Sequence, residues 1–245
     1  MSKGAVLILG ARSDIGRAVA RRFAAEGHPV QLAARNAQAL EADRADFELR
    51  YRVPVTLHEF DALATEGHAA FVEGLPALPE IAVSSVGLMG QQDESERDGA
   101  AAARVIRSNF EGPASILAEL ANRFEARGHG TLVGISSVAG DRGRASNYVY
   151  GSAKAGFTAF LSGLRNRLAK KGVHVVTVLP GFVATQMTEG MDLPPRLTAQ
   201  PDEVAQAIST AVARERDVIY VRPVWRIVMM VIRFMPERIF KRTRI

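Results

Sequence analysis

A tyrosine and a lysine four positions apart, Tyr150 and Lys154, have the chemistry needed to transfer a proton. A helix-compatible stretch begins at Tyr150, and residues four apart lie on one face of a helix. An ammonium group beside a phenol lowers the pKa of the phenol from its reference value near 10, so the tyrosine can exchange a proton with a substrate oxygen. Taken alone, a tyrosine and a lysine four apart are common, and two side chains that face solvent would be the better interpretation.

A serine supplies the third group of this candidate site. Ser137 lies thirteen positions before Tyr150 and directly follows an apolar run that predicts a strand. It is therefore expected at the carboxyl edge of a parallel sheet, where such sheets bind ligands. Ser136 and Tyr148 are the neighbouring alternatives, but the spacing of thirteen and the lysine partner favour Ser137 with Tyr150.

A glycine loop near the start of the chain predicts a nucleotide site. The first apolar run ends at Gly10, and a helical pattern begins at Gly16. Glycines let the backbone turn sharply and let a pyrophosphate approach the amino end of the helix, where unpaired N–H groups and the helix dipole favour an anion. Two glycines six apart also occur in ordinary strand-to-helix turns, so this prediction needs support from the second strand.

Two arginines provide that support and indicate which nicotinamide nucleotide binds. The second strand of such a fold ends beside the adenosine ribose, where an acid favours a free 2′-hydroxyl and an arginine favours a 2′-phosphate. Arg35 occupies this place, and Arg12 can add a second charge-assisted hydrogen bond to the same phosphate. NADP(H) is therefore preferred, and NAD(H) stays possible. The alternative is that both arginines are solvated surface residues.

Short apolar runs alternate with longer helix-compatible stretches, which predicts parallel strands connected by helices. Near-continuous apolar runs suit strands that are covered on both faces. We therefore expect an α/β fold, a Rossmann-type doubly wound parallel sheet of about seven strands, in a single domain over residues 1–245. A loop or mobile flap is expected over residues 186–200. Strands are expected at residues 5–9, 30–33, 55–59, 81–84, 130–135, 173–178 and 218–221, and helices at residues 16–26, 111–127, 150–170 and 202–214.

Composition excludes several classes of protein. There is no cysteine, so neither disulfides nor thiolate chemistry is available. The first apolar run is too short for a signal peptide and no stretch has the length of a membrane span, so a cytoplasmic location is expected. The net charge of +5 arises in the tail, residues 222–245. No basic face with a nucleic-acid docking motif is recognisable, so nucleic acid is not an expected partner. The basic residues of the tail are Arg222, Arg226, Arg233, Arg238, Lys241, Arg242 and Arg244, against the single acid Glu237.

The combined motifs resemble the short-chain dehydrogenase/reductase family over nearly the whole chain. In order, they are the glycine loop, Asn109 in a Ser-Asn-Phe-Glu-Gly segment, Ser137, Tyr150 with Lys154, and Pro180-Gly181 after a strand. The resemblance implies that Tyr150 is the general acid or base and that Lys154 lowers its pKa and binds the nicotinamide ribose. It further implies that Ser137 holds the substrate oxygen and that Asn109 anchors a water in the proton relay.

The resemblance also implies a set of cofactor contacts. Asp61 would contact the adenine amine, and Thr185 would fix the carboxamide. Two departures from the family pattern stand out: Asp14 replaces the middle glycine of the loop, where it could cap the helix, and Ser84-Ser85-Val86-Gly87 replaces Asn-Asn-Ala-Gly. The expected cofactor residues are Gly10, Arg12, Ser13, Ile15, Gly16, Arg35, Asp61, Gly87, Tyr150, Lys154, Pro180, Gly181, Val183 and Thr185.

Residues 136–142 and 146–152 and the tail resemble one group within that family more narrowly. Its members reduce a 2-keto sugar on a polyprenyl phosphate after a flavoprotein oxidase has acted. The resemblance implies a small-molecule or lipid-linked keto-sugar substrate, a flavoprotein oxidase partner and a homodimer or homotetramer. The alternatives are a reductase of another ketone, such as a 3-oxoacyl thioester, and a sensor that binds NADP(H) without turnover.

The tail itself allows two physical interpretations. Residues 224–235 form an apolar run that Arg226 and Arg233 interrupt, too short and too charged to span a bilayer. Such an amphipathic basic segment can lie in the interface of an anionic membrane, as peripheral contact at its inner face. It can equally form a helix that packs on its own domain or in a dimer interface.

Overall fold

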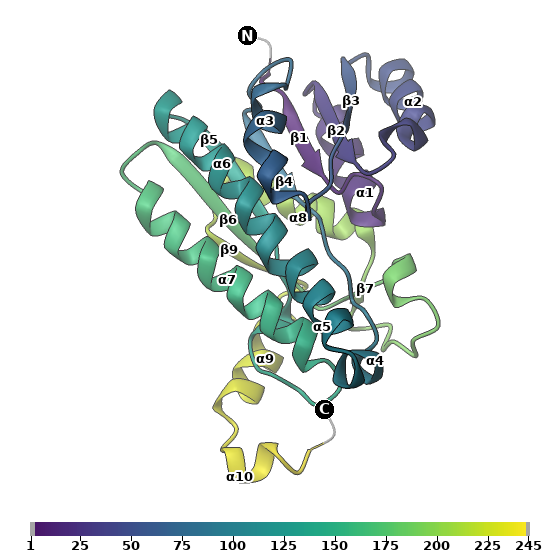
Figure 1. Cartoon of the computed structure of the whole chain (residues 1–245), viewed down its shortest axis with the longest axis vertical. Helices are drawn as coiled ribbons and strands as arrows, with labels where there is room; N and C mark the ends of the chain where they lie inside the picture. The colour runs from purple at the N-terminus through teal and green to yellow at the C-terminus, as the bar shows by residue number, and fades with distance from the viewer. Residues whose placement is uncertain (1–2, 244–245) are drawn as a thin grey trace.

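A seven-stranded parallel sheet forms the centre of the computed structural model, which describes residues 3–243 (Figure 1). The strand order β3-β2-β1-β4-β5-β6-β9 confirms the expected doubly wound Rossmann-type sheet. Arg244, one of the basic residues expected in the tail, lies outside the described residues. The strands of the sheet are β1 (Val6–Leu9), β2 (Val30–Ala34), β3 (Val55–Glu59), β4 (Ile81–Ser84), β5 (Gly130–Ile135), β6 (Val173–Pro180) and β9 (Val218–Val221).

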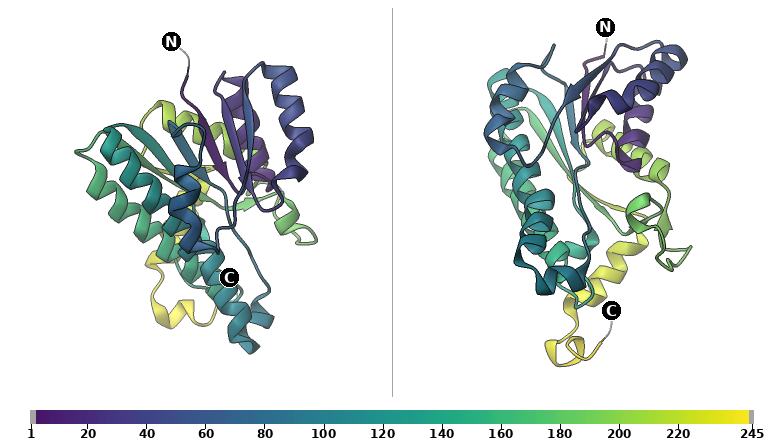
Figure 2. Two further views of the ribbon diagram at one scale, coloured as in Figure 1. Left: turned by 45° about the horizontal axis from the view of Figure 1, so that its top comes forward. Right: turned by 45° about the vertical axis from the view of Figure 1, so that its right-hand side comes forward.

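Helices cover both faces of the sheet, as the right-hand view of Figure 2 shows. Alternate residues of a strand point to opposite faces, so Ile8 of β1 packs in one apolar core and Leu9 in the other. The first core lies under α1, α2 and α8, and the second under α3, α6 and α7. The helices are α1 (Asp14–Ala25), α2 (Glu41–Tyr51), α3 (His68–Glu73), α4 (Gln92–Arg97), α5 (Gly99–Ile106), α6 (Gly112–Arg127), α7 (Tyr148–Leu168), α8 (Pro201–Ala213), α9 (Val224–Phe234) and α10 (Glu237–Phe240).

The strand order reverses between β1 and β4, and this determines where a ligand can bind. From β1 the chain adds β2 and β3 on one side, and from β4 it continues on the other side. The loops after these two strands therefore diverge and leave a crevice at the carboxyl edge. Ser85 joins the two loops, because its amide and its hydroxyl both donate to the Leu9 carbonyl at 2.9 Å.

The segment expected to be a loop over residues 186–200 is partly regular. A short 3₁₀ helix covers Gln186–Thr188, and β8 (Thr198–Ala199) pairs in parallel with β7 (Phe182–Val183). Val183 and Ala199 are buried in the first core. Burial of these two apolar side chains stabilises the small sheet, although the segment has no clear periodicity of its own.

The basic tail forms helix α9, which packs on the chain's own domain. Trp225, Met229 and Ile232 are buried on one side of α9 against Val138 and Leu179. The interpretation of the tail as a packed helix is therefore confirmed for this side. Together α9 and α10 extend beyond the carboxyl edge of the sheet (Figure 1). Within residues 3–243 no helix combines the length and the apolar character that crossing a bilayer requires.

Candidate active site

In the glycine loop, backbone atoms of neighbouring segments lie too close together for side chains to fit between them. Gly10 has φ +82°, and a Cβ there would lie 3.0 Å from Val86 N. A Cβ on Gly16 would lie 2.6 Å from the Gly10 carbonyl. Side chains are thus excluded from both positions. Ser13 caps α1, since its hydroxyl accepts from Gly16 N at 3.0 Å and donates to the Gly10 carbonyl at 2.9 Å.

Asp14 does not cap the helix, which corrects the expectation from its position in the loop. Ser13 is the N-cap, and Asp14 is the first residue of α1. The Asp14 carboxylate accepts a hydrogen bond of 2.8 Å from Gln186 N. It therefore ties the start of the segment 186–200 to the glycine loop, across a sequence separation that no local pattern reveals.

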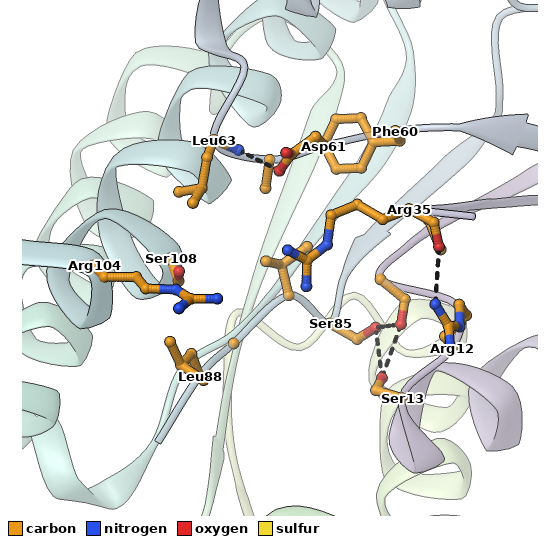
Figure 3. A pocket seen from close by; sticks show the side chains of 15 residues that line it. Arg12, Ser13, Arg35, Phe60, Asp61, Leu63, Ser85, Leu88, Arg104 and Ser108 are labelled. Carbon is orange, nitrogen blue, oxygen red and sulfur yellow. Dashed lines mark hydrogen bonds between the residues drawn. The ribbon is translucent and has the colours of Figure 1, made fainter. Parts of the chain in front are cut away.

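A cavity of about 380 Å³ opens beside the glycine loop. Arg35 and Arg104 reach into it from opposite sides, with Asp61 at its rim (Figure 3). Arg12 donates from Nη1 to the Arg35 carbonyl at 3.1 Å. The cavity carries three guanidinium groups against one lining carboxylate, so it favours an anion. The expected cofactor residues that line it are Gly10, Arg12, Ser13, Arg35, Asp61 and Gly87.

Sequence patterns alone did not reveal two features of this cavity. Arg104 belongs to α5, an alanine-rich helix that no strand or glycine motif introduces. Glu59 accepts hydrogen bonds from Asn36 N at 2.7 Å and Ala37 N at 2.9 Å. Its pKa is lowered by these two amides and, to a smaller extent, by Arg12. Glu59 thereby holds Asn36 in its left-handed conformation directly after Arg35.

A second, more apolar cavity of about 120 Å³ adjoins the first, because Ser85, Val86 and Gly87 line both. Ser137, Tyr150 and Lys154 all line the second cavity, so the fold brings the three predicted residues together. Gly16 and Asn109 line neither cavity. The other expected residues found here are Ile15, Gly87, Pro180, Gly181, Val183 and Thr185.

Lys154 is fixed by the sheet as well as by its helix. Its side chain is 3% exposed, and Nζ donates to the Ile135 carbonyl at the end of β5 at 3.0 Å. The same nitrogen lies 5.8 Å from the centroid of the Tyr150 ring. The spacing of four residues on a helix therefore places the ammonium near the phenol. The Ile135 carbonyl of β5 orients the ammonium.

Burial dominates the pKa values of this pair. It raises the pKa of Tyr150 to about 12, although a hydrogen bond with Ser137 opposes the rise. Burial also lowers the pKa of Lys154 to about 7. The direction for Tyr150 is the reverse of that expected from the neighbouring ammonium, because loss of water disfavours the phenolate more than these contacts stabilise it. At neutral pH the phenol therefore keeps its proton.

Ser136 and Tyr148, the alternatives to Ser137 and Tyr150, have different contacts and exposure. Ser136 is buried, and its hydroxyl donates to the Lys154 carbonyl at 3.0 Å and bonds Thr158 Oγ1 at 2.7 Å. Tyr148 is 45% exposed and lines neither cavity. Ser137 starts the 3₁₀ turn after β5, where its hydroxyl accepts from Ala139 N at 3.1 Å.

Asn109 lies behind the site in a π-helical turn, Arg107–Glu111, a feature often found at functional sites. Its Nδ2 donates to the Leu88 carbonyl at 2.6 Å and the Val105 carbonyl at 2.8 Å. A Cβ on Gly87 would lie 3.1 Å from Asn109 Oδ1 and 3.7 Å from Lys154 Nζ. Gly87 thus separates the amide from the lysine without closing the space between them.

Three further residues of the second cavity have no counterpart in the motifs. Arg144 and Asn147 come from the loop before α7, and Trp225 comes from α9. A Cβ on Gly181 would lie 1.9 Å from the Trp225 ring, so the indole occupies the space of an absent side chain. Trp225 Nε1 donates to the Leu197 carbonyl at 3.0 Å. The only signal in the sequence was the apolar character of the tail, which does not tell which surface it covers.

Comparisons with known proteins agree with this geometry. A family model described as short chain dehydrogenase matches residues 4–194. An uncharacterized oxidoreductase of Mycobacterium tuberculosis is 38% identical over 97% of this chain and 96% of its own length. An acetoacetyl-CoA reductase of Allochromatium vinosum is 30% identical over 83% of this chain and 88% of its own. A short-chain dehydrogenase from Sphingobium yanoikuyae in complex with NADPH superposes with a TM-score of 0.81 at 25% identity, covering 92% of each chain.

Proposed function

Because this chain belongs to the short-chain dehydrogenase/reductase family and is an oxidoreductase of that family, we propose that it reduces a keto group with NADPH. The observation that carries the proposal is the convergence of Ser137, Tyr150 and Lys154 in a cavity that is continuous with the one at the glycine loop. A protein that only senses the nucleotide has no use for a partly buried proton donor at this junction.

The residues at the glycine loop fit a dinucleotide with a 2′-phosphate. Gly10 and Gly16 leave no room for side chains, and Arg12, Arg35 and Arg104 supply positive charge at the adenosine end. Binding of NADPH by the Sphingobium relative is consistent with this preference. When bound, the cofactor supplies the hydride. Within the proposal Asp61 contacts the adenine and Thr185 the carboxamide, while Ile15, Pro180, Gly181 and Val183 line the nicotinamide end.

The proposed chemistry of the protein itself is proton transfer. The hydroxyls of Ser137 and Tyr150 hold the substrate oxygen, and the phenol of Tyr150 donates its proton as negative charge develops there. A phenol whose pKa is about 12 is fully protonated at neutral pH, which suits an acid in the direction of ketone reduction. Lys154, with a pKa of about 7, is then half-charged near pH 7 and can return the proton. Asn109 would anchor the water that relays it.

For the substrate we propose a 2-keto sugar linked to a polyprenyl phosphate, as in the decaprenylphosphoryl-2-ulose reductases that the sequence resembles. Support comes from α9, since Trp225 forms part of the wall of the substrate cavity. The side of α9 away from the domain is apolar and exposed, with Ile227, Met230, Val231 and Phe234. Arg226 and Arg233 interrupt this apolar surface. We propose that it contacts an anionic membrane peripherally.

The proposed assay uses NADPH oxidation with a polyprenylphosphoryl 2-ketopentose, alone and coupled to a flavin oxidase that generates it. Turnover in the coupled assay supports the substrate and the oxidase partner. Turnover of simple ketones without turnover of the lipid-linked sugar would support the reductase function and refute the proposed substrate. Failure to oxidise NADPH with any ketone would refute the reductase function.

Reduction of a 3-oxoacyl thioester is the second candidate. The named acetoacetyl-CoA reductase of Allochromatium vinosum favours it. The same assay with acetoacetyl-CoA separates the two, because a thioester reductase should prefer acetoacetyl-CoA over the keto sugar by a large factor in kcat/KM.

A further inference from the structure

Arg144 is a cation in the second cavity that is not paired directly with a carboxylate of the described residues. It lines the cavity beside Tyr150 and Lys154, and its Nε is buried without a hydrogen-bond partner among residues 3–243. Among the described residues, no carboxylate lies within salt-bridge distance of its guanidinium. Burial lowers the pKa of Arg144, and the charge of Asp141 opposes this to a smaller extent. The Asp141 carboxylate itself accepts from the Tyr220 hydroxyl at 3.1 Å.

Arg142, by contrast, is an arginine with a structural role. The Arg142 guanidinium donates to the Ile232 carbonyl at 2.6 Å and to Glu237 at 2.8 Å, and it packs on the Phe240 ring at 3.7 Å. Arg142 thus fastens the carboxyl end of α9. Arg144, two positions later, makes none of these contacts with the described residues. A partly buried guanidinium without these contacts is costly unless a ligand supplies the anion.

The rest of the cavity has a matching character. No aspartate or glutamate is found among its described lining residues, and its cationic side chains are Arg144 and Lys154. A second polar atom, Asn147 Oδ1, is also buried without a hydrogen-bond partner. Buried polar atoms are generally paired, so two unpaired ones on one loop facing one cavity point to a missing ligand. Arg144 Nε would donate to an anion, and Asn147 Oδ1 would accept from a hydroxyl or an amide.

We propose that Arg144 binds an anionic group, a phosphate or a carboxylate, on the ketone substrate, and that Asn147 Oδ1 accepts from a hydroxyl of the same molecule. The inference rests on the proposed reductase function and specifies its substrate class as anionic ketones. A guanidinium suits this task, because its planar fork can bind two oxygens of one phosphate or carboxylate. A phosphate could belong to a free sugar phosphate or to the phosphodiester of a lipid-linked sugar.

The test compares charged and neutral ketones in matched pairs: D-ribulose 5-phosphate with D-ribulose, and levulinate with methyl levulinate. Each is assayed for kcat/KM with NADPH, and each is titrated calorimetrically into protein saturated with NADP⁺. The variants are Arg144→Met and Arg144→Lys. Arg50→Met, which removes a positive charge from the exposed face of α2, is the control. A polyprenylphosphoryl 2-ketopentose is added as the lipid-linked probe.

Wild type and Arg50→Met should favour at least one charged ketone over its neutral partner by about tenfold to a hundredfold, the range of a charge-assisted hydrogen bond. Arg144→Met should abolish that preference by lowering kcat/KM for the charged ketone far more than for its neutral partner, and Arg144→Lys should retain part of it. A phosphate preference restricted to the lipid-linked probe assigns the phosphodiester; one shared with ribulose 5-phosphate assigns a free sugar phosphate.

Equal use of charged and neutral ketones by the wild type, or an unchanged preference in Arg144→Met, overturns the inference while the reductase stands. If no ketone is reduced, calorimetry still decides: charged ketones that bind wild type but not Arg144→Met uphold the anion site and refute the reductase. Absence of binding by every charged ketone refutes the anion site.

Discussion

At the scale of single residues, the surroundings of the proton-transfer pair decide its chemistry more than its spacing does. A spacing of four predicts that Lys154 lowers the pKa of Tyr150, but burial raises it to about 12. The consequence is a neutral phenol poised to donate, beside an amine whose pKa burial has lowered to about 7. Under the proposed function, the protonated phenol suits an acid in the direction of ketone reduction at neutral pH.

The lowered pKa of Lys154 predicts a pH-dependent stability. Between pH 7 and 10.5 the unfolded chain holds a proton on Lys154 that the folded chain has released. Folded protein therefore gains stability as pH rises through this window, by up to about 1.4 kcal/mol per pH unit. Lys154→Met should lose this dependence and unfold at higher denaturant than wild type at pH 7. Urea unfolding at pH 7, 8 and 9 checks it, and parallel curves for the two proteins would refute it.

Arg35 should determine cofactor choice. In Arg35→Asp a carboxylate replaces a phosphate partner, so NADPH binding should weaken at least tenfold more than NADH binding. Arg12→Gln should show the same discrimination to a smaller degree, because Arg12 already donates to the Arg35 carbonyl. Fluorescence titration with both nucleotides measures the change. An equal loss for NADPH and NADH would mean that neither arginine reads the 2′-phosphate.

At the scale of elements, helix α9 has two apolar sides with different roles. Trp225 is 4% exposed and fills the space beside Gly181, whereas Ile227 is 61% and Phe234 is 83% exposed. The inner side therefore contributes Trp225 to the wall of the second cavity, and the outer side is not covered by the described part of the domain. In the sequence both sides form one apolar run over residues 224–235, and the structure separates the buried Trp225 and Ile232 from the exposed side chains.

The two sides of α9 should respond differently to substitution. Trp225→Ser should destabilise the fold by about 3–5 kcal/mol, because it empties a buried aromatic site. The double change Ile227→Ser and Phe234→Ser should leave the melting temperature nearly unchanged but reduce pelleting with anionic vesicles at low salt. Sedimentation with vesicles and thermal melts of both variants give the answer. A wild type that fails to pellet at any salt would exclude the membrane contact.

At the scale of the whole molecule, sequence predicted most of what is locally encoded. The seven strands lie within two residues of their expected bounds; β6, for example, continues to Pro180 instead of ending at 178. The inner strands are apolar runs covered on both faces, whereas the edge strands β3 and β9 are partly exposed. The candidate residues Ser137, Tyr150 and Lys154 could be predicted from their spacing on α7 and from the end of β5, and the structure places them in one cavity. Three features could not be predicted from the sequence, because each depends on segments that meet across the carboxyl edge of the sheet. They are Arg104, Arg144 and the Asp14–Gln186 hydrogen bond.

The central claim is that Tyr150 donates the proton, and one comparison tests it directly. Tyr150→Phe and its control Tyr148→Phe, two positions earlier and outside both cavities, are assayed for ketone reduction and for NADPH binding. Tyr150→Phe should lose roughly 100-fold or more in kcat, as removal of an acid does, while NADPH binds with nearly unchanged affinity. Tyr148→Phe should match wild type in both. A Tyr150→Phe protein that binds NADPH and keeps more than about a tenth of the wild-type rate would contradict the account.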